Sequence, residues 1–163
     1  MSSLLIRPAL TGENPILRRI FEQSRLHVEF DEYLDEEVFD LALIAEDPAG
    51  SAMGAIHGRL DIGFDETIAP TGLGPGPQAW IDRLGVIPSK RRRGVGKALL
   101  NRFAREAVEA GCTHVGGYPD LTSEPSERMA FFAASGLKPL KPEDPTYVIG
   151  GSLVEVISAT ASV

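Results

Sequence analysis

Apolar residues recur along this chain with two different periods, and the change of period predicts where strands and helices lie. Apolar runs that are continuous or alternate with polar residues are typical of strands, whereas apolar residues spaced three and four apart are typical of amphipathic helices. We predict strands within residues 3–10, 41–46, 52–60, 79–87, 112–118 and 146–158. We predict helices within residues 11–30, 31–40, 96–110 and 123–135.

Residues with known capping preferences mark several helix ends. Asn14 followed by Pro15 fits an N-cap and first turn, and Ser123 fits the N-cap of the last predicted helix. Gly111 and Gly136 follow the final apolar positions of two helices, where glycine commonly ends a helix.

The order of these elements predicts an α/β fold with a mixed sheet. The turn sequence DPAGS at 47–51 joins two apolar runs and predicts a β-hairpin, whereas strand, helix and strand between residues 79 and 118 predict a parallel crossover. Residues 61–78 contain four glycines and three prolines, which predicts a flexible surface loop. We expect residues 1–163 to form a single domain with this loop as an insertion.

Composition narrows the range of functions before any motif is considered. The chain has 163 residues, and 16 Lys and Arg against 23 Asp and Glu give it a net charge of -7. This charge disfavours nucleic acid and anionic membranes as partners, so an anion site has to be local. No apolar run is long enough to cross a bilayer. With one cysteine and three scattered histidines, we expect no disulfide, no metal site and a cytoplasmic location.

The stretch GVIPSKRRRGVGKALLNRF, residues 85–103, combines three arginines, two glycines and the start of a predicted helix. It could be a basic nucleic-acid patch, an ordinary strand-to-helix turn or a phosphate cradle. A loop that enters a helix presents unpaired backbone N–H groups and the positive end of the helix dipole, which together attract anions. Gly94 and Gly96 would let a phosphate approach the backbone closely.

The same stretch excludes two familiar nucleotide motifs. A P-loop requires glycine where Arg91 stands and a hydroxyl residue where Ala98 stands, and a dinucleotide fingerprint requires a third glycine. The lysine and arginine side chains of this stretch can still form charged hydrogen bonds to a phosphate, and arginine can form two at once. The cationic residues at the rim are Arg91, Arg92, Arg93 and Lys97.

A strand ending in an apolar residue, then proline, then Arg-x-x-Gly-x-Gly at a helix start is a specific combination. Here it consists of Val86, Pro88, Arg91, Gly94 and Gly96. The later sequence FFAASGL adds an aromatic pair on a helix, followed by glycine and an apolar residue. Together these residues resemble the GNAT superfamily of acyl-CoA-dependent N-acyltransferases, over residues 79–140 and, by element order, loosely over the whole chain.

The resemblance implies a GNAT-like fold, a central mixed sheet flanked by helices, with acetyl-CoA as co-substrate and no metal. It implies that the pyrophosphate lies on the backbone N–H groups of residues 92–97 and that the pantetheine arm pairs with the strand at 84–86. The cofactor-binding residues implied in this way are Leu84, Gly85, Val86, Arg91, Arg92, Arg93, Gly94, Val95, Gly96 and Lys97.

Acylation of an amine by a thioester requires a neutral amine and a polarised carbonyl. The resemblance suggests that a backbone N–H near Val86 polarises the carbonyl. Strand alternation places Asp82 on one face with Trp80, Leu84 and Val86, and many relatives carry an acidic residue there, so Asp82 is the candidate base. The alternative is that Asp82 forms an ion pair in the neighbourhood of Arg83 or caps a loop.

The usual acid of the family is absent. Many relatives carry a tyrosine four residues before the helix-ending glycine, where this chain has Phe132. Tyr118, at the carboxyl end of the strand expected beside the cofactor, is the candidate replacement, with half-buried packing as the alternative. Pro125 also stands where relatives often have asparagine, so a cofactor contact is expected from Ser123 or Ser126.

Other conspicuous residues have structural interpretations. We interpret Cys112 as a small buried hydrophobe, and His57 and His27 as packing or surface residues rather than ligands. The acidic segment 31–40 is expected to be a solvated helix face, although in this fold it would border the acceptor and favour a cationic substrate.

Three functions stay open on the sequence alone. The first is an N-acetyltransferase that passes an acetyl group from acetyl-CoA to a primary amine of a small molecule or peptide, by direct attack in a ternary complex. The second is a non-catalytic acyl-CoA-binding or regulatory domain of the same fold, which Phe132 favours. The third is a nucleic-acid module, which the net charge disfavours. The sequence leaves open the acceptor amine, the acyl chain preference and the oligomeric state, for which a homodimer is one option.

Overall fold

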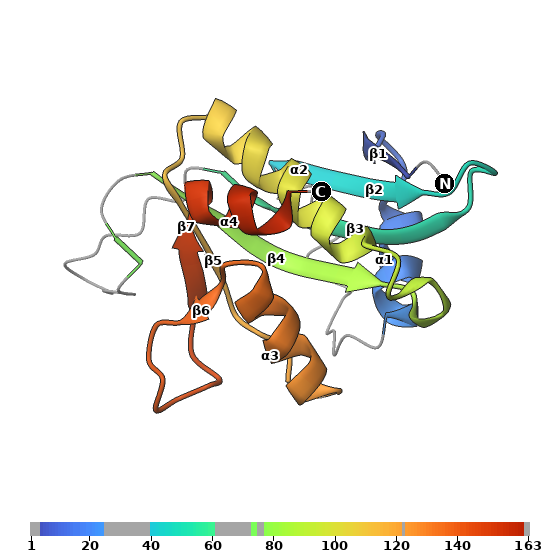
Figure 1. The fold of residues 1–163 in the computed structure, drawn as a ribbon. Coiled ribbons are helices and arrows are strands. Elements are labelled where there is room, and N and C mark those ends of the chain that lie inside the picture. Colours follow the sequence, from blue (N-terminus) through green and yellow to red (C-terminus); the bar gives the residue numbers. More distant parts are fainter. Residues whose placement is uncertain (1–3, 25–39, 61–72, 75–76, 122, 162–163) are drawn as a thin grey trace.

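The computed structural model describes residues 4–24, 40–60, 73–74, 77–121 and 123–161, which form one seven-stranded sheet with helices on both faces (Figure 1). The strand order in the sheet is β1-β2-β3-β4-β5-β7-β6. The strands are β1 (Leu5–Pro8), β2 (Leu41–Glu46), β3 (Ala52–Arg59), β4 (Gln78–Val86), β5 (His114–Gly117), β6 (Lys138–Pro139) and β7 (Ile149–Ser152). The helices are α1 (Asn14–Gln23), α2 (Val95–Glu109), α3 (Pro125–Ala134) and α4 (Leu153–Thr160), with a 3-10 turn at Pro88–Lys90.

The predicted hairpin and the predicted parallel crossover are both confirmed. β2 and β3 pair antiparallel, and the Asp47 carboxylate accepts hydrogen bonds of 2.9 Å from the backbone N–H groups of Ala49 and Ser51 in the turn. β4 and β5 pair in parallel on either side of α2. The remaining neighbours in the sheet are antiparallel, which makes it mixed.

β4 continues well past the point where β5 ends. The parallel register runs only from Gln78 opposite His114 to Ile81 opposite Gly117. Residues 82–86 of β4 therefore have no partner on β5, and the sheet is open on this side of the strand. The opening lies next to the start of α2, where the sequence predicts an anion site.

Asp82 is an extra residue in the pairing of β4 with β3. His57 lies opposite Arg83 and Gly58 lies opposite Ile81, so the register steps at Asp82. Such a bulge reverses the alternation of side chains. The prediction that Trp80 and Leu84 share a face is therefore wrong: Leu84 packs with the α2 side of the core, whereas Trp80 lies against Gly116 on the opposite face.

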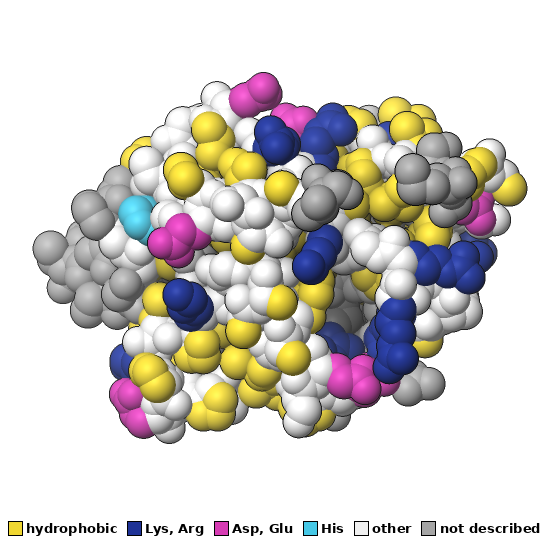
Figure 2. Space-filling view, in the orientation of Figure 1, with side chains coloured by type: hydrophobic (Ala, Val, Ile, Leu, Met, Phe, Trp, Pro, Cys, Tyr) yellow, Lys and Arg dark blue, Asp and Glu magenta, His cyan; other side chains and the backbone are white. Residues whose placement is uncertain are grey.

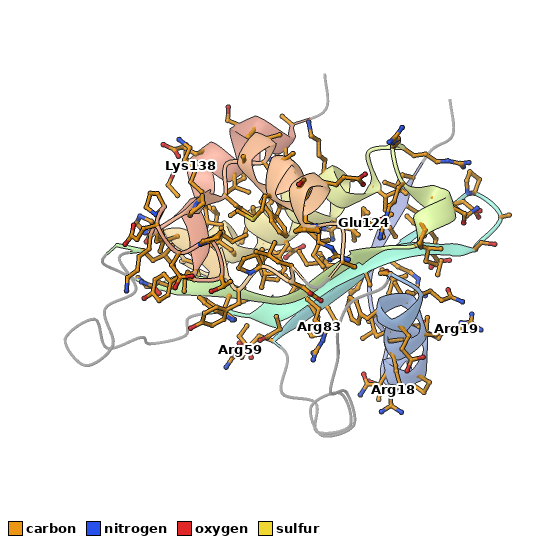
Figure 3. The ribbon with its side chains drawn as sticks, turned by 90° about the horizontal axis from the view of Figure 1, so that it is seen from below. Arg18, Arg19, Arg59, Arg83, Glu124 and Lys138 are labelled. Atoms are coloured by element: carbon orange, nitrogen blue, oxygen red, sulfur yellow. The ribbon has the colours of Figure 1, made fainter. Side chains whose placement is uncertain are left out.

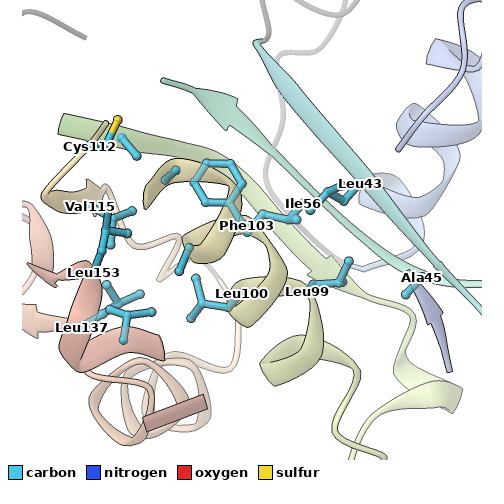
Figure 4. Packing of buried hydrophobic residues seen from close by; sticks show 14 of the residues in the cluster. Leu43, Ala45, Ile56, Leu99, Leu100, Phe103, Cys112, Val115, Leu137 and Leu153 are labelled. Atoms are coloured by element: carbon cyan, nitrogen blue, oxygen red, sulfur yellow. The ribbon is translucent and has the colours of Figure 1, made fainter. Parts of the chain in front are cut away.

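The helices are divided unequally between the two faces of the sheet. Figure 3 shows α1 alone on one face, with the side chains of Arg59 and Arg83 directed to the same side, and the other three helices on the opposite face. The main core lies between the sheet and α2. Leu99, Leu100 and Phe103 of α2 are fully buried there, against sheet residues and Leu153 of α4 (Figure 4).

The end of the chain differs from the prediction of one or two strands over 146–158. β7 stops at Ser152, and α4 follows directly. The Ser152 hydroxyl accepts a 3.2 Å hydrogen bond from the Glu155 backbone N–H, which is an N-cap interaction. Leu153, Val156 and Thr160, at helical spacing, are buried on the inner face of this helix.

Two predicted caps are also wrong. The N-cap of α1 is Glu13 rather than Asn14, with Pro15 inside the first turn, and the N-cap of α3 is Glu124 rather than Ser123. The predicted helix at 31–40 and most of the loop at 61–78 lie outside the described residues, where only Asp40, Leu73, Gly74, Pro77 and Gln78 are described. Leu73, which belongs to that loop, is only 5% exposed and packs onto the sheet.

Candidate functional site

The backbone of β4 presents hydrogen-bonding groups toward the opening in the sheet. The Ile87 N–H donates a 2.9 Å hydrogen bond to the Met53 carbonyl, and bonded pairs alternate along an antiparallel ladder. Because Ile87 bonds to β3, the N–H and C=O groups of Leu84 and Val86 point away from β3. They point toward the side of β4 where β5 has already ended. This edge of β4 can pair with an extended ligand in the manner of an added strand.

A cleft of about 520 Å³ lies along this edge and reaches the start of α2. Figure 2 shows a hollow between α3 and the end of β4, with Lys and Arg side chains beside it and acidic side chains at its lower edge. Of the cofactor-binding residues predicted above, all except Arg93 line the cleft. The lining residues are Ser24, Leu84, Gly85, Val86, Arg91, Arg92, Gly94, Val95, Gly96, Lys97, Glu124, Glu127, Arg128, Phe131 and Phe132.

The two glycines of the motif serve different purposes. Gly94 is the N-cap of α2 with a φ of 77°, a conformation that glycine adopts without strain, and its Cβ direction is open. A Cβ on Gly96 would instead lie 3.1 Å from the ring of Phe131. Gly94 therefore leaves the approach to the α2 N-terminus open, whereas Gly96 allows α3 to pack closely against α2.

Arg91 lines the cleft, but its guanidinium is bonded within the protein. It forms an ion pair with Glu124, donates 3.3 Å to the Val86 carbonyl and donates 3.2 Å to the Ser24 carbonyl at the end of α1. Arg92 and Lys97 are exposed at the cleft. They are the lining cations best placed to meet an anion in solution.

Six residues from elsewhere in the chain complete the cleft; apart from Phe132, which stands in the place of the usual acid, the sequence analysis did not single out five of them as site residues. The carbonyl of Ser24 accepts hydrogen bonds from both Arg91 and Arg128, although 104 residues separate Ser24 from Arg128. No local pattern could have indicated this contact. These five residues are Ser24, Glu124, Glu127, Arg128 and Phe131.

A second cavity of about 290 Å³ adjoins the cleft at the same opening in the sheet. Asp82 and Tyr118, the two predicted catalytic residues, both line it. Its lining includes Arg83, whose side chain points to the α1 face, and Leu137, which packs in the main core on the opposite face. Leu84, Arg128 and Phe132 line both the cleft and this cavity.

Asp82 is a half-buried carboxylate held by an arginine on the neighbouring strand. Arg59 donates to its two oxygens, with Nη2 3.1 Å from one and Nε 3.3 Å from the other. Burial raises the pKa of Asp82 above its ordinary value, and the positive charge of Arg59 opposes that shift. Asp82 therefore forms an ion pair in the wall of the cavity, and its partner is Arg59 on β3 rather than its chain neighbour Arg83.

The other predicted contacts have different surroundings. Tyr118 is 65% exposed, and its ring lies edge-on to Trp80 at 5.3 Å between centroids. Ser123 and Ser126 do not line the cleft, and the Ser123 hydroxyl accepts a 3.0 Å hydrogen bond from Arg128. Phe132, in the place of the usual acid, lies where the two cavities meet.

Of the residues interpreted as packing or surface, Cys112 and His57 are buried, and His27 lies outside the described residues. Cys112 is 4% exposed within the main core. His57 is buried edge-on to Phe21, and burial together with the charge of Arg83 lowers the pKa of its imidazole to about 3. Among the described residues there is no group of three or more His, Cys, Asp or Glu side chains that could hold a metal ion. The described helices include none with the length and apolar composition needed to cross a membrane.

Residues 9–130 match the sequence model of the acetyltransferase (GNAT) family. A comparison with curated protein sequences gives no match. The fold is similar to that of several solved acetyltransferases, at sequence identities too low to show more than the fold.

Three of these structures illustrate the similarity. The GNAT family N-acetyltransferase YhbS of Escherichia coli, solved with CoA, has a TM-score of 0.61 at 18% identity, covering 100% of this chain and 87% of that one. Arabidopsis thaliana Naa50, solved with the bisubstrate analogue CoA-Ac-MVNAL, has a TM-score of 0.69 at 16% identity. The match covers 92% of this chain and 99% of that one. The aminoglycoside N-acetyltransferase AAC(6')-Iy, solved with CoA, has a TM-score of 0.64 at 21% identity, covering 82% and 87%.

Proposed function

Because this chain belongs to the acetyltransferase (GNAT) family, we propose that it transfers an acetyl group from acetyl-CoA to a primary amine of a small molecule or peptide. The observation that carries the proposal is the junction of two cavities at one opening in the sheet. The larger cavity is lined by all but one of the residues predicted to bind the cofactor, and the smaller one is lined by Asp82 and Tyr118.

The cleft suits the chemistry of acetyl-CoA along its whole length. The N-terminus of α2, the open approach at Gly94 and the exposed Arg92 and Lys97 suit a pyrophosphate. The backbone groups of Leu84 and Val86 that point away from β3 suit the amides of a pantetheine arm, and the Val86 carbonyl also accepts a hydrogen bond from Arg91. Acetyl-CoA would supply the reactive thioester, and the chain would orient it so that its acetyl end lies near Leu84 and Phe132.

The arrangement supports direct attack rather than an acyl-enzyme intermediate. Two cavities that share a wall can hold both substrates at once, which removes the need for the protein to carry the acetyl group. Neither cavity is lined by a cysteine among the described residues, and Cys112 is buried in the core. The acceptor amine would enter from the cavity that contains Asp82.

Asp82 is the proposed general base. An amine has to lose a proton before or during its attack, and a carboxylate in a partly desolvated wall accepts a proton more readily than an exposed one. Burial raises the pKa of Asp82, while the Arg59 contact keeps the carboxylate in place. Tyr118, exposed on the same cavity, is proposed to contact the acceptor or the leaving group.

We also propose a cytoplasmic location. The lone cysteine is buried and unpaired with another cysteine, as is usual in a reducing compartment, which also contains acetyl-CoA.

Thiol release from acetyl-CoA across a panel of small amines and short peptides tests the proposal. We expect release that depends on an amine and that falls by about 100-fold in Asp82→Asn, the range typical of a lost general base. Binding of acetyl-CoA without turnover on any amine would favour the non-catalytic alternative, which Phe132 supports. No binding would contradict both.

A further inference from the structure

The place where the two cavities meet restricts where the thioester can react. An acetyl group that passes from the cleft to the second cavity has to cross the surface formed by Leu84, Arg128 and Phe132. The carbon–sulfur bond would therefore break beside these three residues. The side chains of Leu84 and Phe132 are apolar, so among the described residues Arg128 is the one shared residue whose side chain can donate a hydrogen bond or offset a negative charge.

Arg128 is held in a defined position by carbonyl groups from two parts of the chain. Its Nε donates 2.8 Å to the Ser123 carbonyl, and its Nη2 donates 3.0 Å to the Ser123 hydroxyl and 3.3 Å to the Ser24 carbonyl. Its Nη1 donates no hydrogen bond to any residue in the described part of the chain. The edge of the guanidinium formed by Nε and Nη2 is thus fixed, and Nη1 stays available to a ligand.

In the part of the chain that the structure describes, no carboxylate forms a direct ion pair with Arg128. Burial lowers the pKa of its guanidinium, and Arg91 adds to this effect, while the carboxylates of Asp120 and Glu124 oppose it. Glu124 is paired with Arg91. A guanidinium that is partly removed from water interacts with a new negative charge more strongly than an exposed one.

We propose that Arg128 is a catalytic residue that stabilises the departing thiolate, a role that Phe132 cannot fill. The inference rests on the function proposed above. In the reaction the amine nitrogen bonds to the carbonyl carbon, the carbon–sulfur bond breaks, and its electron pair leaves on sulfur. The proton of the amine goes to Asp82, and the thiolate, paired with the guanidinium of Arg128, later takes a proton from water.

Titration of bound CoA tests the inference without turnover. The ultraviolet absorbance of the thiolate is followed against pH in the complex with CoA, at saturating protein. We expect the wild type to lower the pKa of the bound thiol by at least about one unit below the ordinary thiol value, as a nearby cation does. Arg128→Met should return the pKa to that of free CoA, and Arg128→Lys should retain part of the shift.

Steady-state kinetics provides the second readout. Arg128→Met should lower kcat by about 100-fold, the effect of removing one preorganised donor, with a much smaller change in KM for acetyl-CoA. Arg128→Lys should recover part of the loss. Arg105→Met is the matched control, because Arg105 is exposed on α2, lines neither cavity and carries the same charge.

The outcomes separate this inference from the proposed function. CoA that binds with an unshifted thiol pKa in the wild type would overturn the role of Arg128 and leave the acetyltransferase proposal standing. CoA that does not bind the wild type at all would overturn the proposed function itself. If Arg128→Met loses its circular dichroism signal, the wild-type titration and Arg128→Lys, which keeps the charge, still decide the question.

Discussion

The Asp82 carboxylate accepts two hydrogen bonds from Arg59 at the point where the pairing of β3 and β4 steps by one residue. The bulge places an acidic side chain in the wall of the second cavity, beside the open edge of β4. An ion pair therefore fixes the carboxylate that we propose as the base. Because burial raises its pKa, the Asp82 carboxyl group loses its proton at a higher pH than an ordinary aspartate does.

The pH dependence of turnover should report this carboxylate. Because the ionised form accepts the proton, kcat/KM should fall on the acidic side, with an apparent pKa above 3.8. Asp82→Asn should remove this limb, and Arg59→Met should move it to higher pH because the stabilising cation is lost. The measurement is a pH–rate profile with saturating acetyl-CoA, and an unchanged acidic limb in Asp82→Asn would exclude Asp82 as the base.

The same variant should not lose stability at neutral pH. When folding raises the pKa of a carboxyl group, the protonated group costs the folded state nothing at low pH. As the pH rises above the pKa of the unfolded state, ionisation favours unfolding, so the group lowers the free energy of unfolding at neutral pH. Asp82→Asn removes that ionisation, so its thermal midpoint at neutral pH should equal or exceed that of the wild type. A large drop in the midpoint would mean that lost activity reflects lost structure.

Gly96→Ala should disturb the cleft through α3. The added Cβ would lie 3.1 Å from the Phe131 ring, which lines the cleft, so the ring or the helix has to move. We expect weaker binding of CoA with little net change in stability, because the cost of overpacking opposes the gain from the higher helix propensity of alanine. Calorimetry with CoA and thermal unfolding measure the two effects. Phe131→Leu in the Gly96→Ala background should restore binding, and a failure to do so would contradict the contact.

Ser152→Ala tests the origin of α4. The variant removes the side chain that accepts the Glu155 N–H, and loss of such a cap costs about 1 kcal/mol. Chemical denaturation should show this loss, while KM for acetyl-CoA stays the same because Ser152 lines neither cavity. Ser152→Thr, which can still cap, is the control. Equal stability of the alanine and threonine variants would show that the cap does not hold the helix.

Acid should weaken the link between α1 and the sheet edge. Arg7 is paired with Glu13 and Glu46, and its hydrogen bonds lower the pKa of Glu13 from its ordinary value of 4.5 to about 2. Ionised Glu13 therefore stabilises the folded state at pH values above its pKa in the unfolded chain. This contribution is lost as the pH falls from about 4.5 to about 2.

Glu13→Gln should therefore be less stable than the wild type at neutral pH, by about 1 kcal/mol for a partly exposed pair. The difference should vanish at low pH, where Glu13 is protonated in both states of the wild type. Denaturation at several pH values measures it, and a difference that does not depend on pH would contradict the assignment.

Local patterns were sufficient to predict the strand, the loop and the helix that line one side of the cleft, β4 to α2. Three features follow one another in the sequence: the apolar strand, Gly94 and Gly96, and the helical spacing of the apolar residues after them. Because they are adjacent, each makes the assignment of the next element more certain. The final helix was missed because LVEVIS is rich in residues that favour strands, although Ser152 and Glu155 form an S-x-x-E signature that indicates a helix start.

Contacts between distant parts of the chain could not be predicted in the same way. A one-residue bulge such as that at Asp82 leaves no mark on an alternating pattern, so the faces of Trp80 and Leu84 were assigned incorrectly. Arg128 and Ser24 meet only because α1 and α3 converge on the same end of β4. The role proposed for Arg128 depends on that convergence and not on any local motif.

Calorimetric titration of acetyl-CoA tests the central claim, that the cleft beside β4 holds the cofactor, most directly. The wild type should bind one equivalent, and replacement of both Arg92 and Lys97 by Gln should weaken binding by at least about 10-fold, as expected when charged contacts to phosphate are lost. Replacement of Arg19 and Arg105 by Gln removes the same charge from surfaces outside both cavities, and binding should change little. Absent binding, or an equal loss in the two double variants, would contradict the claim.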